Sequence, residues 1–173
     1  MMDLPLVSSA FNTPINNTGS VVASDTDIHM PIKMTACGRC SMCKSSYFNT
    51  NSTYTSFVTG RSFSVTTKGA ENLTFTCKAR NLIYLITCTK CSVQYVGMTT
   101  QQINTRFNQH RYNILKQSLN TILVKHFNSE DHHYGNLSIQ IIDYVEDPSE
   151  DVTHKLRSLL DEDTEHYLSL WLK

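Results

Sequence analysis

Apolar residues dominate three short stretches in the second half of the chain. Residues 82–86 and 94–96 are rich in the β-branched and aromatic side chains that favour strands, and residues 137–145 begin with alternating apolar and polar positions. The polar residues 87–91 join the first two stretches over a length that suits a hairpin. This pattern predicts three strands of one small sheet.

Three other stretches repeat their apolar residues at helical spacing. Thr99 and Gln102 fit a capping box that would start the first helix, residues 119–127 predict a second, shorter helix, and residues 151–173 predict a third. The side chains on one face are Ile103, Phe107, His110 and Ile114 in the first helix, and Leu156, Leu159, Leu160, Tyr167, Leu170 and Trp171 in the last. The order ββααβα indicates an α+β domain, with a small three-stranded antiparallel sheet flanked by helices.

The chain divides into three segments of different composition. Residues 1–35 are rich in Ser, Thr, Asn and Asp without any apolar period, which predicts a disordered N-terminal tail. Residues 36–79 hold four of the six cysteines, and residues 57–65 alternate around a Thr-Gly turn signal before a further apolar stretch at 73–76. We expect a small β-rich zinc module there, followed by the α+β domain at residues 80–173.

Composition and charge narrow the class of protein only slightly. Hydrophobic residues make up 40% of the 173 residues, which is enough for a buried core. Fifteen Lys and Arg residues balance fifteen Asp and Glu residues, so contact with nucleic acid would depend on a local patch. With no apolar run of membrane-spanning length and no signal-peptide pattern at the start, we expect no membrane contact and an intracellular, nuclear location.

The first cysteine set has the spacing of a metal site. Cys37, Cys40 and Cys43 form C-x-x-C-x-x-C, and Cys77 can return as the fourth thiolate of a tetrahedral site. Free buried thiols and a redox C-x-x-C are the alternatives, but three cysteines in register favour zinc, which also supplies folding energy to a short segment.

The second set combines cysteine with histidine. Cys88 and Cys91 lie in the predicted hairpin, and His126 and His132 follow with a spacing common in Cys2His2 sites. His133 is an alternative to His132. The histidines could instead belong to a helix end and a loop, but the preceding C-x-x-C favours a second structural zinc ion.

Two tyrosine motifs precede the predicted helix at a fixed spacing. Leu-Ile-Tyr ends at Tyr84, and after ten intervening residues Tyr95 begins Tyr-Val-Gly, which ends at Gly97. Arg106 follows Gly97 by nine residues and His110 by thirteen. This combination resembles the GIY-YIG nuclease motif. Together with the two sets of cysteines and histidines, it resembles the variant attached to Penelope-like retroelements, over about residues 37–173.

The resemblance implies a metal-dependent DNA endonuclease that nicks its substrate with Mg²⁺ or Mn²⁺ and uses two zinc ions for structure only. It assigns the general base to Tyr84 or Tyr95. Arg106 would then hold the scissile phosphate, and His110 would orient water or shuttle a proton. Each of these residues also has a structural interpretation, because tyrosines in strands usually pack in the core and a histidine on an apolar face can bond a carbonyl.

The resemblance also implies a glutamate on the last helix as the ligand of the catalytic metal. Glu165 matches by residue type and by the aromatic Tyr167 that follows it, whereas Asp163 lies on the apolar stripe of the predicted helix. Glu162 is a third candidate. The sequence leaves this choice open.

Two rival functions remain on the sequence alone. One is a catalytically inactive zinc protein that binds nucleic acid, and the other is a zinc-stabilised module for protein interactions. Local charge is compatible with the nuclease and with the nucleic-acid binder, because basic residues accumulate around the first cysteine set and acidic residues accumulate in residues 146–165. The basic residues are Lys33, Arg39, Lys44, Arg61, Lys68, Lys78, Arg80 and Lys90.

Overall fold

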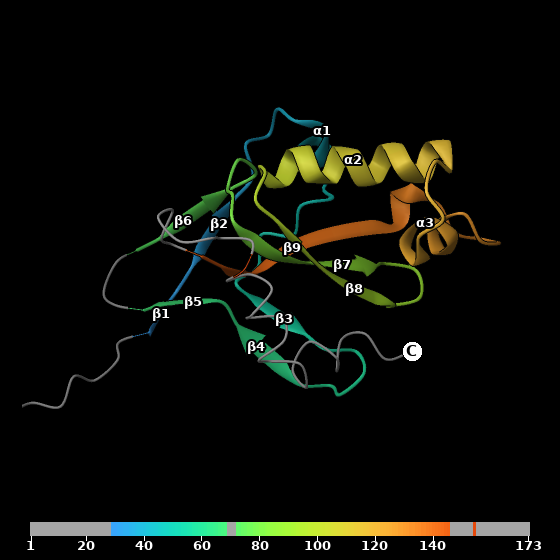
Figure 1. The fold of residues 1–173 in the computed structure, drawn as a ribbon. Helices are drawn as coiled ribbons and strands as arrows, with labels where there is room; N and C mark the ends of the chain where they lie inside the picture. Colours follow the sequence, from blue (N-terminus) through green and yellow to red (C-terminus); the bar gives the residue numbers. More distant parts are fainter. Residues whose placement is uncertain (1–28, 69–71, 146–153, 155–173) are drawn as a thin grey trace, which may run out of the picture.

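The computed structural model describes residues 29–68, 72–145 and 154. Its centre is a three-stranded antiparallel sheet in the order β8-β7-β9, built from β7 (Leu82–Cys88), β8 (Gln94–Thr99) and β9 (Leu137–Tyr144) (Figure 1). The predicted hairpin and third strand are therefore confirmed, and so is the α+β class. β7 lies in the middle and is almost wholly buried, which explains its continuous run of apolar residues.

The helices cover one face of this sheet. α2 (Ile103–Lys116) runs along the outside, α3 (Ile122–Phe127) lies beside it, and a short 3-10 helix, η1 (Tyr134–Asn136), leads into β9 (Figure 1). The predicted apolar face of α2 is confirmed, because Ile103, Phe107 and Ile114 are buried.

Both helix starts differ from the prediction. Thr99 does not cap α2: it is the last residue of β8, and its hydroxyl accepts the Gln101 N–H at 3.0 Å, whereas the N-cap residue is Gln102. α3 begins at Ile122 rather than near 119, because Gln117 adopts a left-handed conformation that ends α2, and Thr121 then caps α3.

The first half of the described chain is rich in short strands, as predicted. They form three two-stranded sheets, in which β1 pairs with β5, β2 with β6, and β3 with β4. Their bounds are β1 (His29–Pro31), β2 (Lys33–Thr35), β3 (Thr53–Thr55), β4 (Ser62–Ser64), β5 (Thr66–Lys68) and β6 (Thr74–Thr76), and a single helical turn, α1 (Ser41–Lys44), lies between β2 and β3.

Two expectations for this region are corrected. The predicted disordered tail extends too far, because residues 29–35 already form β1 and β2, whose pairing with later strands buries Ile32 and Met34. The hairpin around the Thr-Gly turn begins upstream of Phe57, with β3, so Phe57 lies in the turn and is 51% exposed. Strand partners distant in the sequence explain why local composition misplaced these boundaries.

The cysteine-rich segment and the central sheet share one core. Phe48 forms a parallel bridge with Ile139 of β9, and the Ile139 N–H donates to the Tyr47 carbonyl at 2.8 Å. The buried side chains form a continuous cluster that contains residues from Ile32 to Val145. The predicted boundary near residue 80 is therefore not a break in packing, because a segment of this size buries its apolar side chains against the sheet.

The predicted last helix lies outside the described residues, apart from His154, which is helical. Glu162, Asp163 and Glu165 lie outside them as well. Within the described part of the chain, no helix combines the length and the apolar character needed to cross a membrane.

A buried glutamine provides a test of the shared core. Gln140 of β9 is 5% exposed and donates to the carbonyls of Asn51 and Thr53 at 2.7 and 2.8 Å. Gln140→Leu removes both donors, so we expect the free energy of unfolding to fall by about 1 to 3 kcal/mol in chemical denaturation. Gln102→Leu is the control, since the Gln102 side chain does not cap α2. Equal stability of the two variants would contradict this role of Gln140.

Candidate functional site

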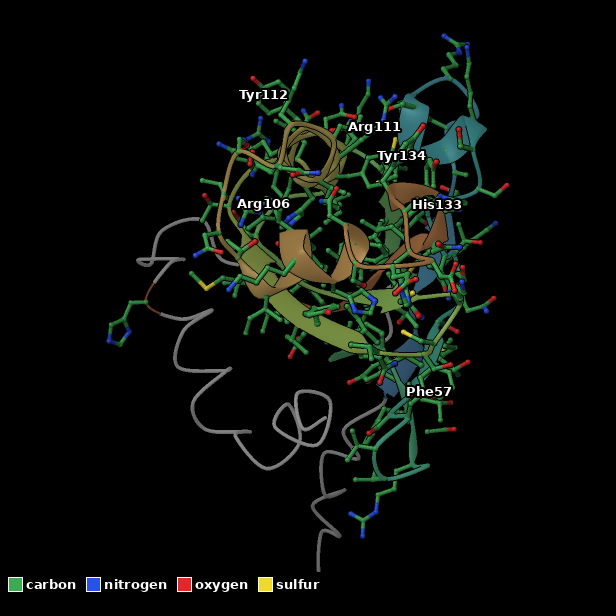
Figure 2. All side chains as sticks on the ribbon, turned by 90° about the vertical axis from the view of Figure 1, so that its right-hand side faces the viewer. Phe57, Arg106, Arg111, Tyr112, His133 and Tyr134 are labelled. Atoms are coloured by element: carbon green, nitrogen blue, oxygen red, sulfur yellow. The ribbon has the colours of Figure 1, made fainter. Side chains whose placement is uncertain are left out.

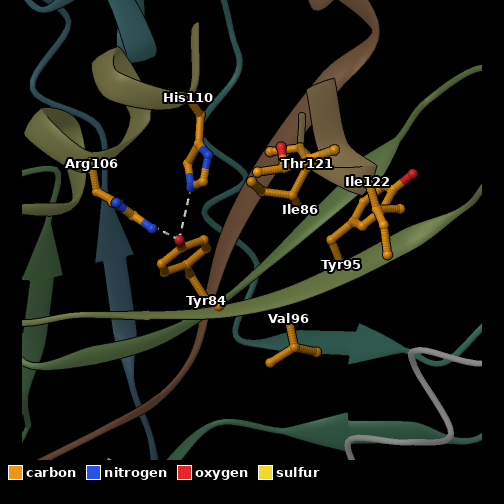
Figure 3. Close-up of a pocket in the computed structure, with 10 residues that line it drawn as sticks. Tyr84, Ile86, Tyr95, Val96, Arg106, His110, Thr121 and Ile122 are labelled. Carbon is orange, nitrogen blue, oxygen red and sulfur yellow. Dashed lines mark hydrogen bonds between the residues drawn. The ribbon is translucent and has the colours of Figure 1, made fainter. Parts of the chain in front are cut away.

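A hydrogen-bonded cluster of three predicted residues lies between β7 and α2. The Tyr84 hydroxyl lies 2.8 Å from His110 Nε2 and 3.0 Å from Arg106 Nε (Figure 3). The Tyr84 side chain is only 2% exposed, whereas Arg106 and His110 are partly exposed. The structure therefore brings together three of the predicted catalytic side chains.

The glycine of the second motif makes room for the tyrosine of the first. Tyr84 pairs with Gly97 across the β7–β8 ladder. A Cβ atom at Gly97 would lie 2.6 Å from both Cζ and the hydroxyl oxygen of Tyr84, closer than real contacts allow. Arg106 and His110 are four residues apart on α2, so both reach the same hydroxyl from one face of the helix.

Arg106 fixes the direction of one of these two hydrogen bonds. Its Nε can only donate, so the Tyr84 oxygen accepts from it. The direction of the second bond follows the His110 tautomer: with the imidazole proton on Nδ1, the neutral ring accepts the Tyr84 proton at Nε2, and both groups are then satisfied. Burial, and secondly the Arg106 charge, lower the pKa of His110 to about 4. Burial raises the pKa of Tyr84, and Arg106 opposes that rise.

Two glutamines extend the cluster, and the sequence reasoning missed them. Gln109 Oε1 accepts from Arg106 Nη1 at 3.1 Å, and Gln109 Nε2 donates to Gln101 Oε1 at 2.8 Å. Gln109 is three residues after Arg106, a spacing that places two side chains side by side on a helix. This spacing could have indicated the contact from the sequence. These contacts fix the plane of the guanidinium group.

Tyr95 belongs to the same cleft but not to the hydrogen-bonded cluster. It pairs with Ile86, two positions along β7 from Tyr84, so the two tyrosines are diagonal rather than opposite. Its ring centroid lies 5.6 Å from that of His126. The structure therefore separates the two candidates for the general base: Tyr84 contacts Arg106 and His110, and Tyr95 packs beside a metal-ligand candidate.

The cleft between the sheet, α2 and α3 has a volume of about 250 Å³. Its walls are Tyr84, Ile86, Tyr95, Val96, Gly97, Arg106, His110, Thr121, Ile122 and Leu123 (Figure 3). None of the described residues in these walls is an aspartate or a glutamate. The carboxylate candidates for a catalytic metal all lie outside the described residues.

The four cysteines of the first set meet at one point. The sulfurs of Cys37, Cys40, Cys43 and Cys77 all lie within 4.8 Å of one another. The backbone N–H groups of Cys40 and Arg39 donate to Cys37 Sγ at 3.4 Å each, and they lower the pKa of Cys37 to about 6. Burial has the opposite effect on Cys43 and Cys77, whose pKa values it raises. The convergence of the four sulfurs means that the set can hold a zinc ion, as predicted.

The second predicted set also converges. Ligand atoms of Cys88, Cys91, His126 and His132 lie within 4.8 Å of one another. His132 Nε2 is buried without any hydrogen-bond partner among the described atoms, which is costly unless a metal ion binds it. His133 is not part of this group, and its Nδ1 instead accepts the Gly135 N–H at 3.1 Å. The set therefore fits a second tetrahedral metal ion.

No protein-family model, curated protein or solved structure matches the chain. The chemistry of the cleft and of the two ligand sets is therefore the basis for proposing a function.

We expect two zinc ions per chain, one in each ligand set, when the protein is purified without chelator. Native mass spectrometry of Cys40→Ser and Cys91→Ser should each show the loss of one ion, because each variant removes a ligand from a different set. Protein that carries no zinc, or variants that both retain two ions, would show that these sets are not metal sites.

The partial burial of His110 between the sheet and α2 makes its titration unusual. The His110 pKa is about 6.5 in the unfolded chain and about 4 in the folded protein, so folding favours the neutral ring. The resulting contribution to the free energy of unfolding is fully present above pH 6.5 and is lost as the pH falls towards about 4. In an NMR titration, we expect the His110 ring to remain neutral at pH 5.5, with the resonance assigned by its absence from His110→Gln. A midpoint near the ordinary histidine value would refute the hydrogen-bonded arrangement with Tyr84.

Proposed function

We propose that the chain is a metal-dependent DNA endonuclease of the GIY-YIG type, similar to the endonucleases of Penelope-like retroelements, and that it nicks phosphodiester bonds. The observation that carries this proposal is the Tyr84 hydroxyl, which is held between Arg106 and His110 at the wall of an open cleft.

Phosphodiester hydrolysis requires a deprotonated water and neutralisation of charge on the phosphate. In this proposal the Tyr84 oxygen takes the proton of an attacking water while the original Tyr84 proton moves to His110 Nε2. The products of this step are hydroxide, neutral tyrosine and a protonated His110. Because His110 is neutral beforehand, it can accept the proton, and the contact between these side chains favours Tyr84 over Tyr95 as the base.

Arg106 retains donors for the phosphate. A guanidinium group has five N–H donors, and the bonds to Tyr84 and Gln109 use two of them. The remaining donors can clamp phosphate oxygens while the Tyr84 and Gln109 contacts hold the group in place.

A bound Mg²⁺ or Mn²⁺ ion would supply further neutralisation at the bridging oxygens. Its carboxylate ligand in this proposal is Glu165, Asp163 or Glu162. The proton relay described above depends only on residues of the described cleft.

A catalytically inactive protein that binds nucleic acid is the second candidate. The two ligand sets are equally compatible with this binding protein and with the nuclease, because structural zinc sites can stabilise either kind of protein. The two candidates differ in what the Tyr84 hydroxyl does.

Tyrosine replacements separate these functions. Tyr84→Phe keeps the ring against Gly97 and removes only the hydroxyl, so Mg²⁺-dependent nicking of supercoiled plasmid should fall by about a hundredfold or more while DNA affinity is retained. Tyr95→Phe is the matched control and should retain most of the activity. Wild-type protein that binds DNA without nicking it, with either metal, would support the inactive binder instead.

Loss of the guanidinium group should affect both binding and chemistry. Arg106→Ala removes a phosphate contact and also removes charge stabilisation in the transition state. We expect transition-state stabilisation to fall by about 3 kcal/mol, as calculated from the ratio of the kcat/KM values of wild type and variant. Gln109→Ala leaves the charge in place and frees the guanidinium group, so its effect should be smaller. Unchanged nicking by Arg106→Ala would rule out this cleft as the active site, even if the protein is a nuclease.

A further inference from the structure

The neutral total charge conceals a strong segregation of charge. Residues 29–68 and 72–145 contain twelve of the fifteen Lys and Arg residues but only three of the fifteen Asp and Glu residues, a formal net charge of +9. A part of the chain with this charge attracts a polyanion such as nucleic acid. The attraction is greatest where basic side chains gather without acidic neighbours.

Basic side chains lie on both sides of α2. Arg106 faces the cleft on one side, and Arg111 lies on the other, where its guanidinium carbon is 5.5 Å from the centre of the Tyr134 ring. Figure 2 shows the two arginines on opposite sides of the helix viewed nearly along its axis. The stacking on Tyr134 holds Arg111 in a defined position.

Two basic residues beside the first cysteine set lie on the Arg111 side. Arg39 and Lys44 are exposed residues of the loop and helical turn that carry these cysteines. This turn contacts α2 directly, because Ser41 Oγ donates to Asn108 Oδ1 at 2.8 Å. Within the described residues, no carboxylate forms an ion pair with Arg39, Lys44 or Arg111. We name these three residues the outer basic ridge.

The top of α2 between the cleft and this ridge carries no acidic side chain, and Lys116, four residues after Tyr112, adds a positive charge to this face. Thr105, Asn108 and Tyr112 are exposed there, and Tyr112 is 60% exposed. An α-helix with its side chains is about 10 to 12 Å across, and the major groove of B-DNA is about 12 Å wide. A helix of this kind, with basic groups on both sides, matches a groove bordered by two phosphate backbones.

We infer that a DNA duplex binds with α2 in its major groove, one strand at Arg106 in the cleft and the phosphates of the other strand on the outer basic ridge. The inference rests on the proposed function, and it adds the groove that α2 enters and a second contact surface. Arg39, Lys44 and Arg111 bind phosphate and do not take part in the chemistry.

The test is the salt dependence of binding by the full chain, measured by fluorescence anisotropy with a labelled duplex in magnesium-free buffer. Arg111→Gln and Lys44→Gln should each weaken duplex affinity and reduce the slope of log K against log salt by about 0.9, the value for one phosphate contact. Arg61→Gln is the matched control, because Arg61 precedes β4 on the hairpin at the other face of the sheet (Figure 1). Its slope should equal that of the wild type.

Binding of the same oligonucleotide as a single strand tests whether the ridge contacts the second strand of a duplex. A single strand has no second backbone to place on the ridge. Its affinity should be lower than that of the duplex and insensitive to Lys44→Gln. If both ridge variants have normal zinc content and an unchanged slope of log K against log salt with the duplex, the ridge does not bind phosphate. Nicking by the wild type would in that case still support the proposed function. Equal sensitivity of single strand and duplex would overturn the groove arrangement. Ridge-dependent duplex binding without nicking would instead refute the nuclease and leave the surface standing.

Discussion

The convergence of Cys88, Cys91, His126 and His132 is the constraint on which the cleft depends. α3 has six residues, too few for a helix to be stable by itself, and this ligand set joins it to the β7–β8 turn. Thr121, Ile122 and Leu123 at the start of α3 form the cleft wall across from Tyr84. A metal ion in this set would therefore fix one wall of the candidate active site without taking part in its chemistry.

Burial of the Tyr84 hydroxyl determines the remaining geometry. A buried hydroxyl destabilises the fold unless it is hydrogen-bonded, and Arg106 and His110 satisfy both its acceptor and its donor capacity. The ring fits only because residue 97 is glycine. Burial lowers the pKa of His110 and so keeps its ring neutral, and the hydrogen bond to Tyr84 holds Arg106 in place. The proposed proton relay would use the same arrangement that satisfies the buried hydroxyl.

Local periodicity predicted the features that depend on neighbours in sequence, namely the hairpin and the apolar face of α2. The spacing of cysteines and histidines predicted both ligand sets, because each set begins with a local C-x-x-C pair. Features that depend on distant partners were not predictable: the pairing of residues 29–35 and the docking of the cysteine-rich segment through Gln140. The support of Arg106 by Gln109 is different, because their i,i+3 spacing on one helix could have indicated it. The balanced total charge also hid the positive charge of residues 29–68 and 72–145, because most acidic residues of the sequence fall outside these two ranges.

The central claim is that the cleft beside Tyr84 is a metal-dependent hydrolytic site. Anomalous diffraction from crystals of the zinc-loaded protein soaked in Mn²⁺ tests it most directly, because manganese and zinc are distinguished by their absorption edges. The account predicts a manganese ion in the cleft near the Tyr84 hydroxyl, coordinated by Glu165, Asp163 or Glu162. A cleft without manganese, with all three of these carboxylates ordered and turned away from it, would contradict the account.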